Sequence, residues 1–161
     1  MKSKQTESKT FQYQSFIETS IDNIIRFHEN PDALAQLTPP PLIVQILDDQ
    51  RKGLTAGSIL FRLWFGPIPV RWLAEHQAGP EKDSFSDVMR EGPMAYWEHN
   101  HIFREVKGGV ELMDELHYRH HKGWRGVLTR LMFDGLALKF LFWYRHWRTR
   151  VGVQKLNQGQ A

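Results

Sequence analysis

The chain has 161 residues, of which 41% are hydrophobic and 24% charged, and these values are typical of one globular domain. It has no cysteine, which excludes a disulfide scaffold, a thiolate metal site and a cysteine nucleophile and fits a reducing cytoplasm. The net charge is +3, and the sequence shows neither an apolar signal segment nor a long apolar run. We therefore expect a soluble, cytoplasmic protein with a flexible N-terminus (1–9), one domain (10–150) and a polar C-terminal tail (151–161).

The N-terminal part of the chain predicts one strand followed by two short helices. The strand covers residues 11–19, and Thr19 or Ser20 is placed to cap a short helix over residues 21–28. Pro31 then opens a second short helix, which ends at the prolines of residues 39–41 because they remove hydrogen-bond donors.

Apolar runs separated by short turns predict six further strands. They cover residues 42–47, 59–65, 70–77, 85–91, 96–103 and 112–118. The last two flank Gly108-Gly109 and alternate in phase, as the two arms of a hairpin do. Together with the first strand, they predict an antiparallel sheet of about seven strands.

The hydrophobic period changes from two to 3.6 near Gly126. This change predicts one long helix from about Gly126 to Arg150, with a wide apolar stripe and basic residues at its C-terminal end. A curved antiparallel sheet wrapped around this helix would cover the stripe, so the fold class is α+β and a cavity is expected between the two.

Several stretches resemble the helix-grip fold of the SRPBCC superfamily, which includes START lipid-transfer domains, polyketide cyclases and birch-pollen-allergen-like proteins. The resemblance covers roughly residues 10–150 and is to the bacterial ligand-binding branch. It rests on the segments FHENPDAL (27–34), LTPP (37–40), GP (92–93), WEHNHIF (97–103) and DELHY (114–118). It implies a hydrophobic cavity, and relatives bind lipids, sterols, polyketides or plant hormones. Where relatives commonly turn with Pro-Leu-Gly, this chain has the basic sequence His121-Lys122-Gly123.

Four polar residues, Asp87, His99, His101 and Asp114, are predicted on the inner face of the sheet because each is an even number of residues from an apolar neighbour. Three interpretations remain open: a structural Asp–His network, a general acid–base pair acting on a carbonyl substrate as in cyclases and dehydratases, and a metal site. The spacing fixes no third metal ligand, and there is no dinucleotide or phosphate-binding motif. We expect neither a metal nor another cofactor.

The expected partner is a small hydrophobic or amphipathic molecule, lipid-like or aromatic and polyketide-like, bound without catalysis; a cyclase or dehydratase activity is the alternative. The basic run at residues 117–122 lacks the stacking aromatics that nucleic-acid binding needs, so no nucleic acid is expected. The basic end of the long helix suits contact with an anionic membrane. The candidate ligand-binding residues are Arg62, Trp64, Trp72, Phe85, Met89, Trp97, Phe103, Leu116, Tyr118, Phe133, Leu136 and Phe140.

Overall fold

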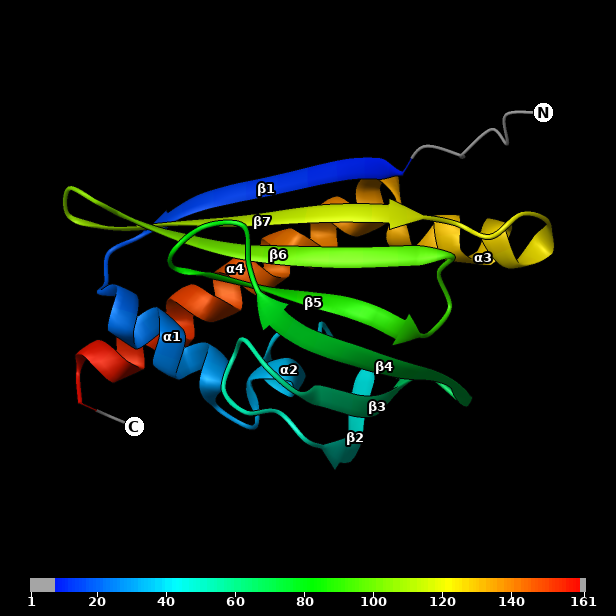
Figure 1. Cartoon of the computed structure of the whole chain (residues 1–161), viewed down its shortest axis with the longest axis horizontal. Coiled ribbons are helices and arrows are strands. Elements are labelled where there is room, and N and C mark those ends of the chain that lie inside the picture. The colour runs from blue at the N-terminus through cyan, green and yellow to red at the C-terminus, as the bar shows by residue number, and fades with distance from the viewer. Residues whose placement is uncertain (1–7, 160–161) are drawn as a thin grey trace.

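The computed structural model describes residues 8–159 and has the α+β architecture expected from the sequence. Seven antiparallel strands form one sheet in the order β1-β7-β6-β5-β4-β3-β2, and α4 lies behind the strands in the view of Figure 1. The elements are β1 (Lys9–Ile17), α1 (Ile21–Glu29), α2 (Ala33–Gln36), β2 (Ile43–Asp49), β3 (Ser58–Phe65), β4 (Ile68–Ala78), β5 (Ser84–Glu91), β6 (Tyr96–Val106), β7 (Gly109–Arg119), α3 (Trp124–Phe133) and α4 (Gly135–Asn157).

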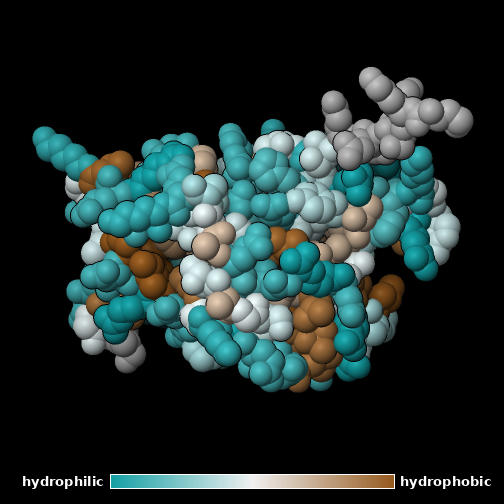
Figure 2. Space-filling view, in the orientation of Figure 1, coloured by the Kyte–Doolittle hydropathy of each residue, from teal (hydrophilic) through white to brown (hydrophobic). Residues whose placement is uncertain are grey.

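The hairpin of β6 and β7 lies between β1 and β5 in the sheet and has the predicted alternation of side chains. Val106 pairs with Gly109, and Gly108 between them has φ of 90°, which glycine adopts without strain. Alternate side chains face the helices, and the opposite face of the sheet is largely hydrophilic in Figure 2. The pairing of β6 with β7 places His101 opposite Asp114, and the pairing of β5 with β6 places Asp87 opposite His99.

The predicted long C-terminal helix is confirmed as α4, but it begins at Gly135 rather than near Gly126, because a break at Asp134 separates it from α3. Asp134 is extended, with φ of −147° and ψ of 164°, and Gly135 follows with φ of 52°. The Asp134 carboxylate accepts hydrogen bonds from the Gly135 amide (3.0 Å), the Tyr118 hydroxyl (2.8 Å) and the Lys9 ammonium. These bonds compete with helix continuation, and the Asp-Gly pair is the sequence signal for such a break.

The predicted boundaries of the domain also need correction. α4 continues through Asn157, whose side-chain oxygen accepts from Thr19 (2.9 Å) and Asn23 (2.7 Å), and Val153 is fully buried. Residues 151–157 are therefore part of the domain rather than of a tail. At the other end Lys9 already belongs to β1, while the rest of the proposed flexible segment, residues 1–7, lies outside the described residues.

We predict that Asp134→Ala lowers the free energy of unfolding by about 2 kcal/mol at pH 7. Burial raises the pKa of the Asp134 carboxyl, but hydrogen bonds from Lys9, Tyr118 and Gly135 outweigh it and lower the pKa to about 2. A depressed pKa stabilises the fold above the unfolded-state value near 4, and this contribution is lost as the pH falls towards 2. Urea unfolding at pH 7 and pH 2.5 should therefore give a smaller difference at the lower pH; an equal difference at both would contradict the prediction.

Candidate functional site: a cavity with a histidine–aspartate cluster

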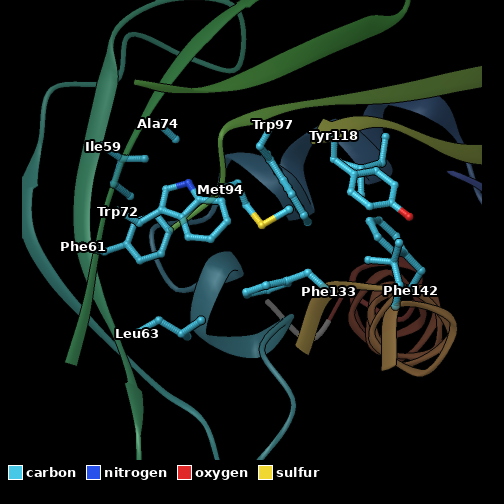
Figure 3. Packing of buried hydrophobic residues seen from close by; sticks show 12 residues of the cluster. Ile59, Phe61, Leu63, Trp72, Ala74, Met94, Trp97, Tyr118, Phe133 and Phe142 are labelled. Carbon is cyan, nitrogen blue, oxygen red and sulfur yellow. The ribbon is translucent and has the colours of Figure 1, made fainter. Parts of the chain in front are cut away.

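A cavity of about 350 Å³ lies between the inner face of the sheet and the helices α2, α3 and α4. Most of its wall is apolar, and prolines 39–41 of the loop after α2 form part of it. The centre of the aromatic wall comes from two strands and one helix: Trp72 of β4 packs edge-on against Trp97 of β6 (ring centroids 5.4 Å apart), and Phe133 from the end of α3 contacts both. Figure 3 shows these side chains turned toward one another.

Two aspartates and two histidines from three adjacent strands form a closed ring at the polar end of the cavity. His99 Nε2 and His101 Nδ1 lie 3.0 Å and 3.1 Å from Asp114 Oδ1. The other ring nitrogens, His99 Nδ1 and His101 Nε2, lie 3.4 Å and 3.0 Å from Asp87 Oδ2. The contact of His101 Nδ1 lacks hydrogen-bond alignment, so this buried nitrogen has no hydrogen-bond partner.

The ring is a charged cluster in a buried place. Burial lowers the pKa of His99, but the charges of Asp114 and Asp87 outweigh it and raise the pKa above its ordinary value. Burial likewise raises the pKa of both aspartates, and the charges of the histidines outweigh it, so both carboxyls have lowered pKa values. Both nitrogens of His99 face a carboxylate, which the imidazolium form satisfies because it has two N–H donors.

A third histidine, His146 of α4, completes the support of Asp114. His146 Nε2 lies 2.9 Å from Asp114 Oδ2, and Ser15 of β1 lies 2.6 Å from His146 Nδ1. Asp114 therefore contacts side chains from the neighbouring strand and from the helix behind it. Local sequence does not predict this role, because His146 lies among the basic residues at the end of the helix and its contact with Asp114 depends on how the helix packs on the sheet.

Two further histidines, which the sequence pattern does not predict as site residues, line the cavity in their neutral form. Burial lowers the pKa of His28 to about 3 and also lowers the pKa of His76. Their Nδ1 atoms donate to the carbonyl oxygens of Ile24 (2.9 Å) and Leu54 (3.1 Å). Each Nε2 is therefore the unprotonated nitrogen, able to accept a hydrogen bond or a proton.

The cavity also contains one arginine without an acidic partner. Arg145 of α4 lines the wall, and within residues 8–159 no carboxylate forms an ion pair with it. Arg51, which also lines the wall, is instead held by Asp49 at 2.6 Å. The sequence predicted a ligand-binding arginine at a different position, Arg62.

The structure places the candidate residues in three groups. The cavity wall includes Trp72, Phe85, Trp97, Phe133 and Phe140, together with Asp87, His99 and His101. Phe103, Leu116 and Tyr118 are buried in the core beside the cavity and do not line it, and Met89 packs against the same core. Arg62, Trp64 and Leu136 are not in the wall.

The predictions for Arg62, Trp64 and Leu136 are corrected for two physical reasons. On β3 the buried residues are Ile59, Phe61 and Leu63. The alternate residues Arg62 and Trp64 therefore face outward, where the Trp64 indole N–H donates to the Gln45 side chain at 3.1 Å. Leu136 lies in the first turn of α4 after the break, on the side away from the sheet, and is 83% exposed.

Comparisons with known proteins identify the fold. The chain matches no protein-family model and no curated protein sequence. Among solved structures, it is similar to the ZhuI aromatase/cyclase from Streptomyces sp. R1128 (TM-score 0.69, 10% identity, covering 92% of this chain and 94% of that one). It is also similar to a START superfamily protein from Mycobacterium smegmatis (TM-score 0.66, 11% identity, 91% and 98% covered).

A third similar structure is a nucleoside-diphosphate sugar epimerase from Corynebacterium glutamicum, with a TM-score of 0.69 and 24% identity over 92% of this chain. The chain spans only 30% of that protein's length. The architecture and these similarities define a helix-grip protein. In particular, the chain shares this fold with a START superfamily protein and with an aromatase/cyclase.

Proposed function

We propose that this protein binds a small amphipathic molecule in the cavity between the sheet and the C-terminal helices. One observation carries the proposal: a largely apolar wall meets a compact polar end formed by His28, His76 and the Asp–His ring. An apolar ligand body would bury its surface against Trp72, Trp97 and their neighbours, which is the main source of affinity in such sites. The START and aromatase/cyclase neighbours support the proposal through their shared architecture.

The polar end favours a ligand with an acidic group. Arg145 supplies a cation that pairs with no carboxylate among residues 8–159, and the neutral His28 lies close enough for its pKa to be affected by Arg145. A carboxylate at this place would pair with the guanidinium in two parallel hydrogen bonds. We therefore propose an apolar or aromatic carboxylic acid as the ligand class.

Arg145→Gln should weaken binding of a naphthalene carboxylic acid about tenfold while changing the affinity of its methyl ester little. Quenching of tryptophan fluorescence in a titration with each probe measures both constants, and micromolar affinity is expected for the wild type. Arg62→Gln is the matched control, because Arg62 lies on the outer face of β3 and should leave both constants unchanged. An equal loss for the acid and the ester would contradict a role for Arg145 in recognising the carboxylate.

A cyclase or dehydratase activity is the second candidate, and the two neutral histidines favour it. His28 or His76 would take an α-proton from a β-hydroxy ketone through its unprotonated Nε2, and protonated His99 would give a proton to the departing hydroxide. The products are an enone and water, and the absorbance of the enone measures the reaction.

Loss of turnover in His76→Phe, with activity kept in His117→Phe on the outer face of β7, would favour catalysis over simple binding.

We also propose that α3 and α4 contact an anionic membrane surface. Residues 120–157 contain eight lysines and arginines and one acidic residue, Asp134, so this region carries +7 although the whole chain carries +3. The same helices expose large apolar side chains: Trp124, Val127, Leu128 and Leu131 on α3, and Leu136, Phe140, Trp143 and Trp147 on α4. Aromatic residues next to cations are typical of helices that lie at the interface of anionic lipids. A second copy of the chain is a poorer partner for this face, because two surfaces of +7 repel each other.

The membrane proposal places α4 on the lipid surface rather than through it. Within residues 8–159, no helix has the length and apolarity needed to cross a bilayer. Phe140 both lines the cavity and is 53% exposed, so the exposed face adjoins the cavity wall and offers a route for an apolar ligand.

Vesicle flotation tests the membrane proposal. The protein should float with vesicles containing phosphatidylserine and not with pure phosphatidylcholine, and binding should weaken at high salt because screening shortens the range of the charges. Trp143→Ala/Trp147→Ala should reduce flotation, whereas Ile68→Ala, an exposed apolar residue of β4, should not. Flotation that is independent of lipid charge, or self-association of the wild type through the same tryptophans, would contradict the proposal.

A further inference from the structure

We propose that Asp87, His99 and His101 bind one divalent transition-metal ion at the polar end of the cavity. One ligand atom from each residue lies within 4.8 Å of the others. Asp87 Oδ2 is 3.0 Å from His101 Nε2 and 3.4 Å from His99 Nδ1. Metal–ligand bonds of about 2.0–2.1 Å in a tetrahedral site place neighbouring ligand atoms roughly 3.4 Å apart, so the two distances from Asp87 are close to those of such a site.

The second nitrogen of each histidine is oriented as metal-bound histidines usually are. His99 Nε2 and His101 Nδ1 both face Asp114 Oδ1, and metal-ligating histidines almost always direct their outer N–H to a carboxylate or carbonyl oxygen. His146 holds the other oxygen of Asp114 at 2.9 Å. Asp114 is thus placed to fix both tautomers, which leaves His99 Nδ1 and His101 Nε2 free to coordinate. In the metal-bound form, the N–H of His101 Nδ1 would also point to Asp114 Oδ1. This contact now lacks the alignment of a hydrogen bond.

The charge of the site fits a divalent cation. Two carboxylates, buried Asp114 and half-buried Asp87, face the same two imidazoles here, and charges in such a place need a compensating cation. A divalent ion with two neutral imidazoles balances both carboxylates. Two imidazole ligands and one carboxylate select ions of the zinc and iron(II) class over Mg²⁺ and Ca²⁺, which prefer oxygen ligands.

The ion would have an open position towards the cavity. Asp87, His99 and His101 all line the cavity, whereas Asp114 lies behind them and does not. Three protein ligands with an open position are typical of metal sites that bind water or a ligand, in contrast to closed structural sites with four. The cavity ligand of the proposed function would then have an electrophilic ion beside its polar group.

Cobalt(II) titration of the chelator-treated wild-type protein tests the site without any organic ligand. We expect one cobalt ion per chain, visible absorption bands of four- or five-coordinate cobalt, and displacement by zinc, with elemental analysis giving the stoichiometry. Asp87→Asn and His101→Gln should each weaken binding at least 100-fold. His146→Gln, which loosens Asp114 without removing a ligand, should weaken it 10–100-fold. His117→Gln is the control, because His117 pairs with Glu115 on the outer face of the sheet.

Two outcomes would overturn the proposal. One is folded wild-type protein, with a native circular dichroism spectrum, that takes up no stoichiometric cobalt or zinc. The other is cobalt binding that persists in a folded His99→Gln/His101→Gln double variant, which would place the metal elsewhere. Neither result depends on the naphthalene probes, so failure of the metal site and failure of the proposed ligand binding are distinguishable.

Discussion

Asp114→Ala is expected to lower the free energy of unfolding by about 3–5 kcal/mol in metal-free protein, the range measured when one partner of a buried charge pair is removed. The Asp114 carboxylate lies within 3.1 Å of nitrogens from three histidines and is 3% exposed. Its removal leaves His99, whose pKa is raised by the two aspartates, with one carboxylate, Asp87, and takes away the side chain that His146 contacts. Urea unfolding with circular dichroism in the presence of a chelator measures the change.

Glu115→Ala provides the matched control for this prediction. Glu115 is the next residue of β7 and faces outward, where it accepts hydrogen bonds from Gln12 (2.6 Å) and lies 2.9 Å from His117. Its partners can bind water instead, so the loss of stability should be below about 1 kcal/mol. Equal losses for the two variants would mean that the buried cluster contributes no more to the fold than a surface network.

The fold could be predicted from the sequence because its signals are local. Alternation in residues 96–103 and 112–118 predicts both strands of the hairpin of β6 and β7, and the same alternation places His99, His101 and Asp114 on one face. The pairing of strands then brought Asp87 to His99 without any long-range information. The hydrophobic period of 3.6 residues predicts helical structure in the C-terminal segment. The break at Asp134 is not predicted, because it depends on hydrogen bonds from Lys9 and Tyr118, which are distant in the sequence.

The rest of the site could not be predicted because it depends on how helices meet the sheet. His28 enters the cavity because Phe27 packs so closely on Gly152 of α4 that a Cβ there would lie 2.2 Å from its ring. His146 and Arg145 are consecutive on α4, yet one supports Asp114 and the other lines the cavity. On β3 both sets of alternate residues include large hydrophobic side chains, so local composition does not decide which face is buried, and the predicted cavity residue Arg62 lies on the outer face.

Ala74→Phe should abolish or weaken binding of both naphthalene probes by at least tenfold, which corresponds to about 1.4 kcal/mol or more. Ala74 is 4% exposed and lies on the inner face of β4 next to Trp72, so a phenyl ring at this position would occupy part of the cavity of about 350 Å³. Because the new ring fills empty space, we expect the stability to change by less than the roughly 1–3 kcal/mol typical of overpacking in a filled core.

Met113→Phe is the matched control for the filled cavity. Met113 pairs with Ile102 on the outer face of the sheet, so the added ring lies outside the cavity and should leave probe affinity unchanged. Tryptophan quenching measures affinity for both variants, and thermal unfolding shows that both are folded. If Ala74→Phe folds and binds the probes as the wild type does, the ligand site is not this cavity, whereas selective loss in Ala74→Phe places the ligand against the inner face of β4.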